Sequence, residues 1–130
     1  MSASMTKPWI DLTPAALAEI PVGTGVYEIR DAGGEVLDIG YAGAREPFGL
    51  RSAIQRVSAE LAGQSGVGLQ IRYEQHVQYR SRHIELVLSH RAHQDGRVPD
   101  RVAAREPAVH GRLAVGSQSR TGGQLRVAAE

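Results

Sequence analysis

Apolar positions change their spacing along the chain, and these changes predict its helices and strands. Between residues 50 and 62 apolar side chains recur every three or four positions, which is typical of a helix with one buried face. Between residues 69 and 77 apolar and polar side chains alternate, which is typical of a half-buried strand. Similar patterns predict a helix over 11–21, strands over 25–30 and 35–40, and a second long helix over 81–96.

The helices also carry end signals and apolar stripes. Thr13 is suited to cap the first helix, Pro14 fits its first position, and Pro21 ends it. A buried stripe on each long helix is expected to pack against a sheet. The stripes are Leu50, Ile54, Val57 and Leu61 in the first long helix, and Ile84, Val87, Leu88 and Ala92 in the second.

The stretch "GVYEIRDAGGEVLDIG" (25–40) predicts a β-hairpin, because "DAGG" is a turn signal between two runs of strand-forming residues. If these four residues form the loop, Tyr27 faces Asp38 on the opposite strand. Arg30 then faces Glu35, an opposite-charge pair. Since side chains alternate across a strand, one face of the hairpin is expected to hold Tyr27, Ile29, Val36 and Asp38. A bulge would shift this register.

The element order is helix, strand, strand, helix, strand, helix. It predicts an α+β fold: a small three-stranded, mainly antiparallel sheet flanked by helices. Residues 1–10 are expected to form a flexible leader and residues 11–100 the domain. Residues 101–130 are expected to form a C-terminal extension that is partly disordered, with a helical turn at "DRVAAREP".

The amino-acid composition excludes several kinds of site and partner. The 130 residues are enough for one domain, and the net charge of +1 gives no argument for a large polyanionic partner. Without cysteine, the chain has no disulfide, thiolate nucleophile or cysteine-based zinc site. No apolar run is long enough to span a membrane, so we expect a cytoplasmic protein with no membrane partner.

Four features then occur in a characteristic order. They are "GVY" at 25–27, "DIG" at 38–40, an arginine near the start of the next helix, and a glutamate on the helix after the third strand. Together they resemble the GIY-YIG nuclease superfamily over roughly residues 20–100. The resemblance implies a metal-dependent endonuclease that hydrolyses phosphodiester bonds in nucleic acid, with DNA favoured as substrate. It also implies one divalent ion, Mg²⁺ or Mn²⁺.

The resemblance assigns roles residue by residue. Tyr27 would activate or position the attacking water, Arg51 would stabilise charge on the phosphate, and Glu85 would bind the metal. Asp38 stands where the second motif normally begins with tyrosine. It could orient Tyr27, bind the metal or act as a general base, or it could be a solvated strand carboxylate. Candidate substrate-binding residues are Tyr41, which could replace the missing phenol, and Arg45 and Arg56, which are also alternatives to Arg51.

Departures from the family pattern favour a second hypothesis. Gln55 stands one turn after Arg51, where histidine or tyrosine is common, and the chain contains no asparagine. The alternative is therefore a catalytically impaired GIY-YIG-like module that binds nucleic acid or protein. A third hypothesis is hydrolysis of a smaller substrate on the same scaffold. Since no separate DNA-binding domain is visible, targeting would need a protein partner or a homo-oligomer.

A zinc site is a further alternative on the second long helix. His90 and His93 lie three residues apart and could share a metal with Asp95. The competing interpretation is that both are surface histidines without a function.

Overall fold

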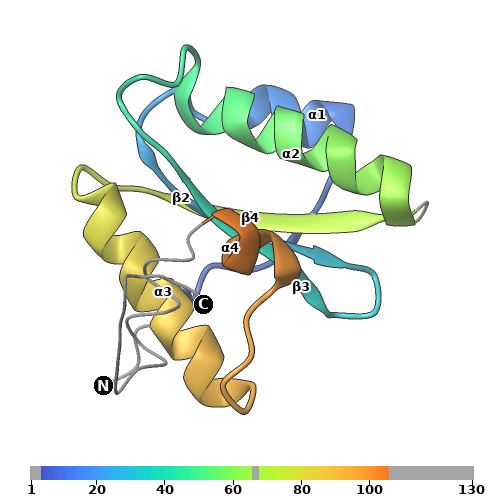
Figure 1. Cartoon of the computed structure of the whole chain (residues 1–130). Coiled ribbons are helices and arrows are strands. Elements are labelled where there is room, and N and C mark those ends of the chain that lie inside the picture. The colour runs from blue at the N-terminus through green and yellow to red at the C-terminus, as the bar shows by residue number, and fades with distance from the viewer. Residues whose placement is uncertain (1–3, 66–67, 106–130) are drawn as a thin grey trace.

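The computed structural model describes residues 4–65 and 68–105. In this part the chain forms an α+β fold, with one antiparallel sheet flanked by helices (Figure 1). The elements are β1 (Ile10–Asp11), α1 (Pro14–Glu19), β2 (Gly25–Asp31), β3 (Val36–Ala42), α2 (Gly49–Ser65), β4 (Leu69–Gln75), α3 (Tyr79–His93) and α4 (Asp100–Arg105).

Two layers of helix enclose the sheet. Helices α1 and α2 cover one face and α3 covers the other, while α4 lies across the edge formed by β3 (Figure 1). Because strand side chains alternate, neighbouring residues of β2 enter different cores: Tyr27 packs with α2, and Val26 packs with α3. The predicted stripe of α2 is confirmed, since Leu50, Ile54, Val57 and Leu61 are all buried.

The sheet has four strands rather than the predicted three, in the order β1-β4-β2-β3. The additional strand, β1, has only two residues and pairs with β4. The segment before it is packed as well, although residues 1–10 were expected to be a leader. Met5 is 2% exposed, and the Trp9 ring contacts the guanidinium groups of Arg30 and Arg72 at 4.4 and 4.3 Å.

The fold also continues past residue 100. Helix α4 begins at Asp100, and its Val102 is 2% exposed in the core beside α3. The predicted extension over 101–130 therefore starts inside a packed helix. Its remaining residues, 106–130, lie outside the described residues.

The register of the β2–β3 hairpin differs from the prediction. Tyr27 pairs with Gly40, and Ile29 with Asp38, before a bulge shifts the ladder toward the turn. The cause lies at the turn, where the backbone N–H of Glu35 donates to the Asp31 side chain at 2.9 Å and Asp31 itself stays in β2. Tyr27 and Asp38 still share a face, but Val36 packs on the opposite one.

Helix α3 is rotated relative to the predicted stripe. Its buried residues are His83, Leu86, Val87 and Ser89. Ile84 and Leu88 are 38% and 39% exposed, and Ala92 is exposed too. Polar contacts decide the rotation, because His83 Nε2 donates to the carbonyl oxygen of Ile39 at 2.9 Å in the core.

The glycines of the two short motifs are required by close packing. A Cβ added at Gly40 would lie 2.3 Å from Tyr27 Oη and 2.4 Å from its Cζ, so the ring can cross β3 only over a glycine. A Cβ at Gly25 would lie 2.1 Å from the carbonyl oxygen of Glu74. Gly40 thus makes room for the Tyr27 ring, while Gly25 allows β2 to lie close to β4.

Substitution Gly40→Ala should therefore destabilise the protein. Forcing a methyl group against a buried ring costs about 1–3 kcal/mol, to be measured as a lower free energy of unfolding in urea. The matched control is Gly68→Ala, since nothing lies within 4 Å of a Cβ at that position. Equal unfolding free energies for the two variants would contradict the packing argument.

Candidate functional site

Tyr27 and Asp38 meet at the junction of α2, β3 and α4. Tyr27 Oη donates a long hydrogen bond to Asp38 Oδ2 at 3.5 Å, and the two residues are 1% and 0% exposed. Asp38 is therefore a buried acceptor for the phenol rather than a solvated strand carboxylate, and it can orient Tyr27.

Two arginines of α4 supply the counter-charge for Asp38. Arg105 Nη2 donates to Asp38 Oδ1 and also to the Ile39 carbonyl oxygen at 3.3 Å. Arg101 Nε lies 3.5 Å from Asp38 Oδ2, and its Nη2 pairs with Glu60 at 2.6 Å. Neither arginine was a candidate from the sequence. The available signal was their spacing of four in "DRVAAREP", which places both on one side of a helical turn.

The environment of Tyr27 favours the neutral phenol. Burial, together with the negative charge of Asp38, raises the pKa of Tyr27 from 10.0 to about 12, although Arg105 and Arg56 act in the opposite direction. At neutral pH the group is therefore a hydrogen-bond donor, and it is poorly suited to act as a base.

Arg51 is held by backbone at the start of α2. Its Nε donates to the carbonyl oxygen of Ile20 at 2.8 Å, which ties α2 to the end of α1. This contact gives Arg51 a structural role at the α1–α2 junction. The charged partners of the Tyr27–Asp38 pair come from α4 instead.

Glu85 does not join these residues. It lies on α3, across the sheet from Tyr27, and its side chain is 58% exposed. Arg82 Nη1 donates to Glu85 at 3.0 Å, and the same arginine binds Glu74 at 2.9 and 3.1 Å. The structure therefore does not bring Tyr27, Arg51 and Glu85 into one pocket.

The donor set around Glu85 does not fit a magnesium or manganese ion. A hard cation needs several oxygen ligands, whereas the neighbour at Glu85 is a guanidinium. Among residues 4–65 and 68–105, no group of three His, Cys, Asp or Glu side chains is close enough to hold a metal. The metal at Glu85 and the zinc alternative at His90, His93 and Asp95 remain predictions without geometric support.

An aromatic and basic cluster lies further along β3. Tyr41 belongs to the strand rather than to the loop in which it was expected. Its ring stacks on Tyr79 with centroids 5.6 Å apart and meets the edge of His83 at 5.0 Å. The Arg80 guanidinium lies 5.3 Å from the Tyr41 centroid, and its Nη1 donates to Tyr41 Oη at 3.2 Å.

The loop from β3 to α2 brings the other two candidate substrate-binding residues close to this cluster. At its start, a Cβ at Gly43 would lie 2.9 Å from Tyr79 Oη. Further on, Glu46 accepts hydrogen bonds from Ser52 at 3.1 Å and Arg56 at 2.8 Å, which fixes the loop on α2. Arg45 is exposed on the same loop.

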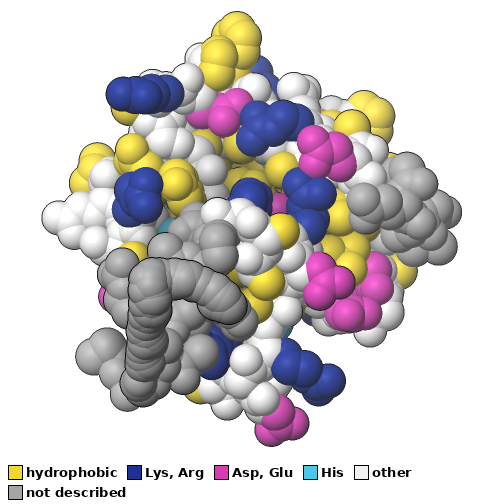
Figure 2. Space-filling view, viewed as in Figure 1, with side chains coloured by type: hydrophobic (Ala, Val, Ile, Leu, Met, Phe, Trp, Pro, Cys, Tyr) yellow, Lys and Arg dark blue, Asp and Glu magenta, His cyan; other side chains and the backbone are white. Residues whose placement is uncertain are grey.

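We call the resulting region the β3-edge surface, and it consists of Tyr41, Arg45, Arg56, Arg80, Arg101 and Arg105. Its five arginines outnumber the three carboxylates that pair with them, Asp38, Glu46 and Glu60. No ion pair of Arg45 or Arg80 occurs within the described residues. Figure 2 shows this face with basic side chains gathered over α2 and α4 and fewer acidic ones between them.

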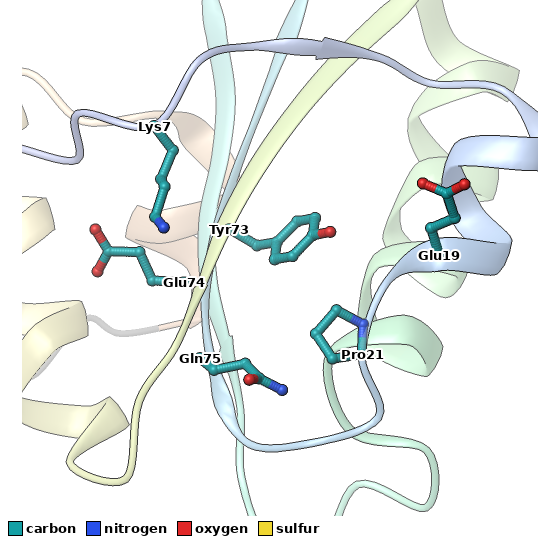
Figure 3. A pocket seen from close by; sticks show the side chains of 6 residues that line it. All are labelled: Lys7, Glu19, Pro21, Tyr73, Glu74 and Gln75. Carbon is teal, nitrogen blue, oxygen red and sulfur yellow. The ribbon is translucent and has the colours of Figure 1, made fainter.

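A groove lies at the opposite edge of the sheet, beside β4 (Figure 3). It encloses about 630 Å³ and is lined by Lys7, Glu19, Pro21, Tyr73, Glu74 and Gln75. The side chain of Lys7 lies beside Glu74, whose hydrogen bonds to Arg82 lower its pKa. The charges here are mixed, since one lysine and two glutamates line the groove, in contrast to the arginine-rich β3-edge surface.

The fold and these two edges define a small α+β domain with a helix-covered antiparallel sheet. Comparison with protein families matches residues 1–93 to the family described as "Domain of unknown function (DUF7508)". Because the match covers most of the chain, the protein belongs to this family. Comparisons with curated proteins and with solved structures gave no match. In the described part of the chain, no helix is long and apolar enough to cross a membrane.

The pKa of Tyr27 predicts a loss of stability at high pH. A folded-state pKa of about 12 against an unfolded value of 10.0 means that the neutral phenol stabilises the fold below pH 10. This contribution, about 3 kcal/mol, should be lost as the pH rises from 10 to 12. Urea unfolding across this range should show a shallower decline for Tyr27→Phe than for the wild type, and identical slopes would contradict the assignment.

Proposed function

We propose that this protein is a GIY-YIG-like domain that binds nucleic acid through the β3-edge surface without hydrolysing it. The observation that carries the proposal is the surplus of guanidinium groups along β3, next to the stacked Tyr41–Arg80 pair. Arginine binds phosphate oxygens through paired N–H donors, and it stacks on aromatic rings as well. DNA is the favoured ligand, from the family resemblance.

Few arginines of the β3-edge surface are free of ion pairs, so we expect weak binding. Arg56, Arg101 and Arg105 are already paired with carboxylates, so Arg45 and Arg80 are the groups most available for phosphate. Binding of this kind is sequence-independent and salt-sensitive, with dissociation constants on the order of 10⁻⁴ to 10⁻⁶ M at physiological salt.

Three features support binding without cleavage. The Tyr27 phenol is buried and neutral, Arg51 is bonded to a backbone carbonyl, and Glu85 pairs with Arg82 on the other side of the sheet. Hydrolysis would need such groups to converge on one phosphate.

Endonuclease activity is the second candidate, and one observation favours it. The contact of Tyr27 with Asp38, and of Asp38 with Arg105, places a phenol, a carboxylate and a guanidinium within one cluster. If α4 moved away, this cluster would lie at the β3 edge, next to the proposed binding surface.

Binding is tested by fluorescence anisotropy with labelled DNA and RNA oligonucleotides at 50–200 mM salt. We expect Arg45→Ala and Arg80→Ala each to weaken binding by about threefold to tenfold, and each to reduce the salt slope by roughly one. Lys7→Ala is the matched control, because it removes the same charge at the opposite edge of the sheet (Figure 3). Equal losses of affinity in all three variants would refute the proposal. Absence of salt-sensitive binding would refute it too, and would favour a protein partner.

Cleavage is tested on supercoiled plasmid with Mg²⁺ or Mn²⁺. We expect the plasmid to remain intact at protein concentrations that bind it fully. Nicking that disappears in Tyr27→Phe, with DNA affinity unchanged, would instead establish the endonuclease candidate. If the nicking also disappeared in Glu85→Ala, Glu85 would again be a candidate metal ligand.

A further inference from the structure

Three loops meet at one end of the sheet, near the β3-edge surface. The backbone N–H of Leu50, at the start of α2, donates to the Gly23 carbonyl oxygen at 2.9 Å. Thr24 and His76 exchange two hydrogen bonds of 3.0 Å, from the His76 N–H and from the Thr24 hydroxyl. The α1–β2, β3–α2 and β4–α3 loops are therefore held side by side.

Each loop exposes one large apolar side chain. Val22, Phe48 and Val77 are 53%, 63% and 86% exposed, and Phe48 is the single phenylalanine of the chain. Isolated exposed apolar residues are ordinary on protein surfaces. Three of them on adjoining loops are less ordinary, and we refer to this group as the loop patch.

The backbone on both sides of Phe48 is fixed by its surroundings. The N–H of Gly49 donates to the Glu46 carbonyl oxygen at 3.1 Å, and the Glu46 side chain is fixed on α2 by Ser52 and Arg56. Gly49 has φ of +54°, and a Cβ there would lie 2.0 Å from the Val22 carbonyl oxygen. The backbone beside Phe48 thus packs tightly against the first loop, so little backbone freedom is left to lose there when a partner binds.

The charge around the patch identifies that partner. Arg45 lies on the same loop, Arg56 reaches that loop through Glu46, and Arg80 stacks on Tyr41 behind it. Figure 2 shows hydrophobic side chains at the upper rim of this face, with both basic and acidic side chains below them. A purely apolar partner would not use this surplus of cations, whereas a nucleic acid offers both flat bases and phosphates.

We infer that Phe48 stacks on an unpaired base while Arg45 and Arg80 bind the flanking phosphates. The ligand class is therefore single-stranded or locally unpaired nucleic acid, because the bases of an intact duplex are already stacked on one another. This inference rests on the proposed function and specifies its ligand.

The test compares a single-stranded oligonucleotide with the duplex of the same sequence. Phe48→Ala should weaken single-strand binding by about tenfold and leave duplex binding unchanged, while Phe48→Trp should retain single-strand affinity. A 2-aminopurine base in the single strand should change its fluorescence on binding to the wild type and to Phe48→Trp, but not to Phe48→Ala. Because Phe48 is exposed, all variants should keep the wild-type unfolding midpoint.

The outcomes separate the two proposals. Salt-sensitive binding that Phe48→Ala does not alter, or alters equally for both ligands, overturns this inference and leaves the proposed function standing. Absence of binding to either ligand overturns both. A concentration-dependent dimer in analytical ultracentrifugation that Phe48→Ala abolishes, with single-strand affinity retained, would assign the patch to a second copy of the chain and overturn the inference.

Discussion

The structure depends on a carboxylate that has no access to water. Asp38 lies at 0% exposure in the hairpin, and an unpaired charge there would be strongly destabilising. Its counter-charge comes from Arg105, 67 residues later in the sequence, and from Arg101 one helical turn earlier. The need to neutralise one strand residue thus fixes the position of α4 against the edge of the sheet. It also gives Tyr27 a charged neighbour that keeps the phenol protonated.

The two motifs that carry the family resemblance have a packing explanation as well. Gly40 of "DIG" leaves room for the ring of Tyr27, and Gly25 of "GVY" leaves room for the backbone of β4. The same residues can serve a scaffold or a reaction centre, and burial distinguishes the two. Here the enclosed phenol is a donor inside the core, while the exposed cations lie on the β3-edge surface.

Sequence patterns predicted the elements whose signals are local. The stripe of α2 and the cap of α1 at Thr13 follow from spacing and from single-residue preferences, and both occur as expected. Longer-range determinants were missed. A hydrophobic pattern does not reveal that His83 is buried with a hydrogen bond to the carbonyl oxygen of Ile39, so the buried face of α3 was assigned wrongly. For the same reason Glu85, which was expected to bind a metal, proved to be an exposed residue that pairs with Arg82. A strand of two residues has no periodicity, and the partners of Asp38 could not be paired across such a distance in the chain.

The family match and the folded unit end at different places. The match stops at residue 93, in the last turn of α3, yet the groups that neutralise Asp38 lie at residues 101 and 105. A fragment cut at the family boundary would keep the sheet and both large helices but would leave an acid in its interior without a cation. Helix α4 beyond the boundary therefore contributes to the domain in two ways: Arg101 and Arg105 neutralise Asp38, and Val102 adds an apolar side chain to the core beside α3.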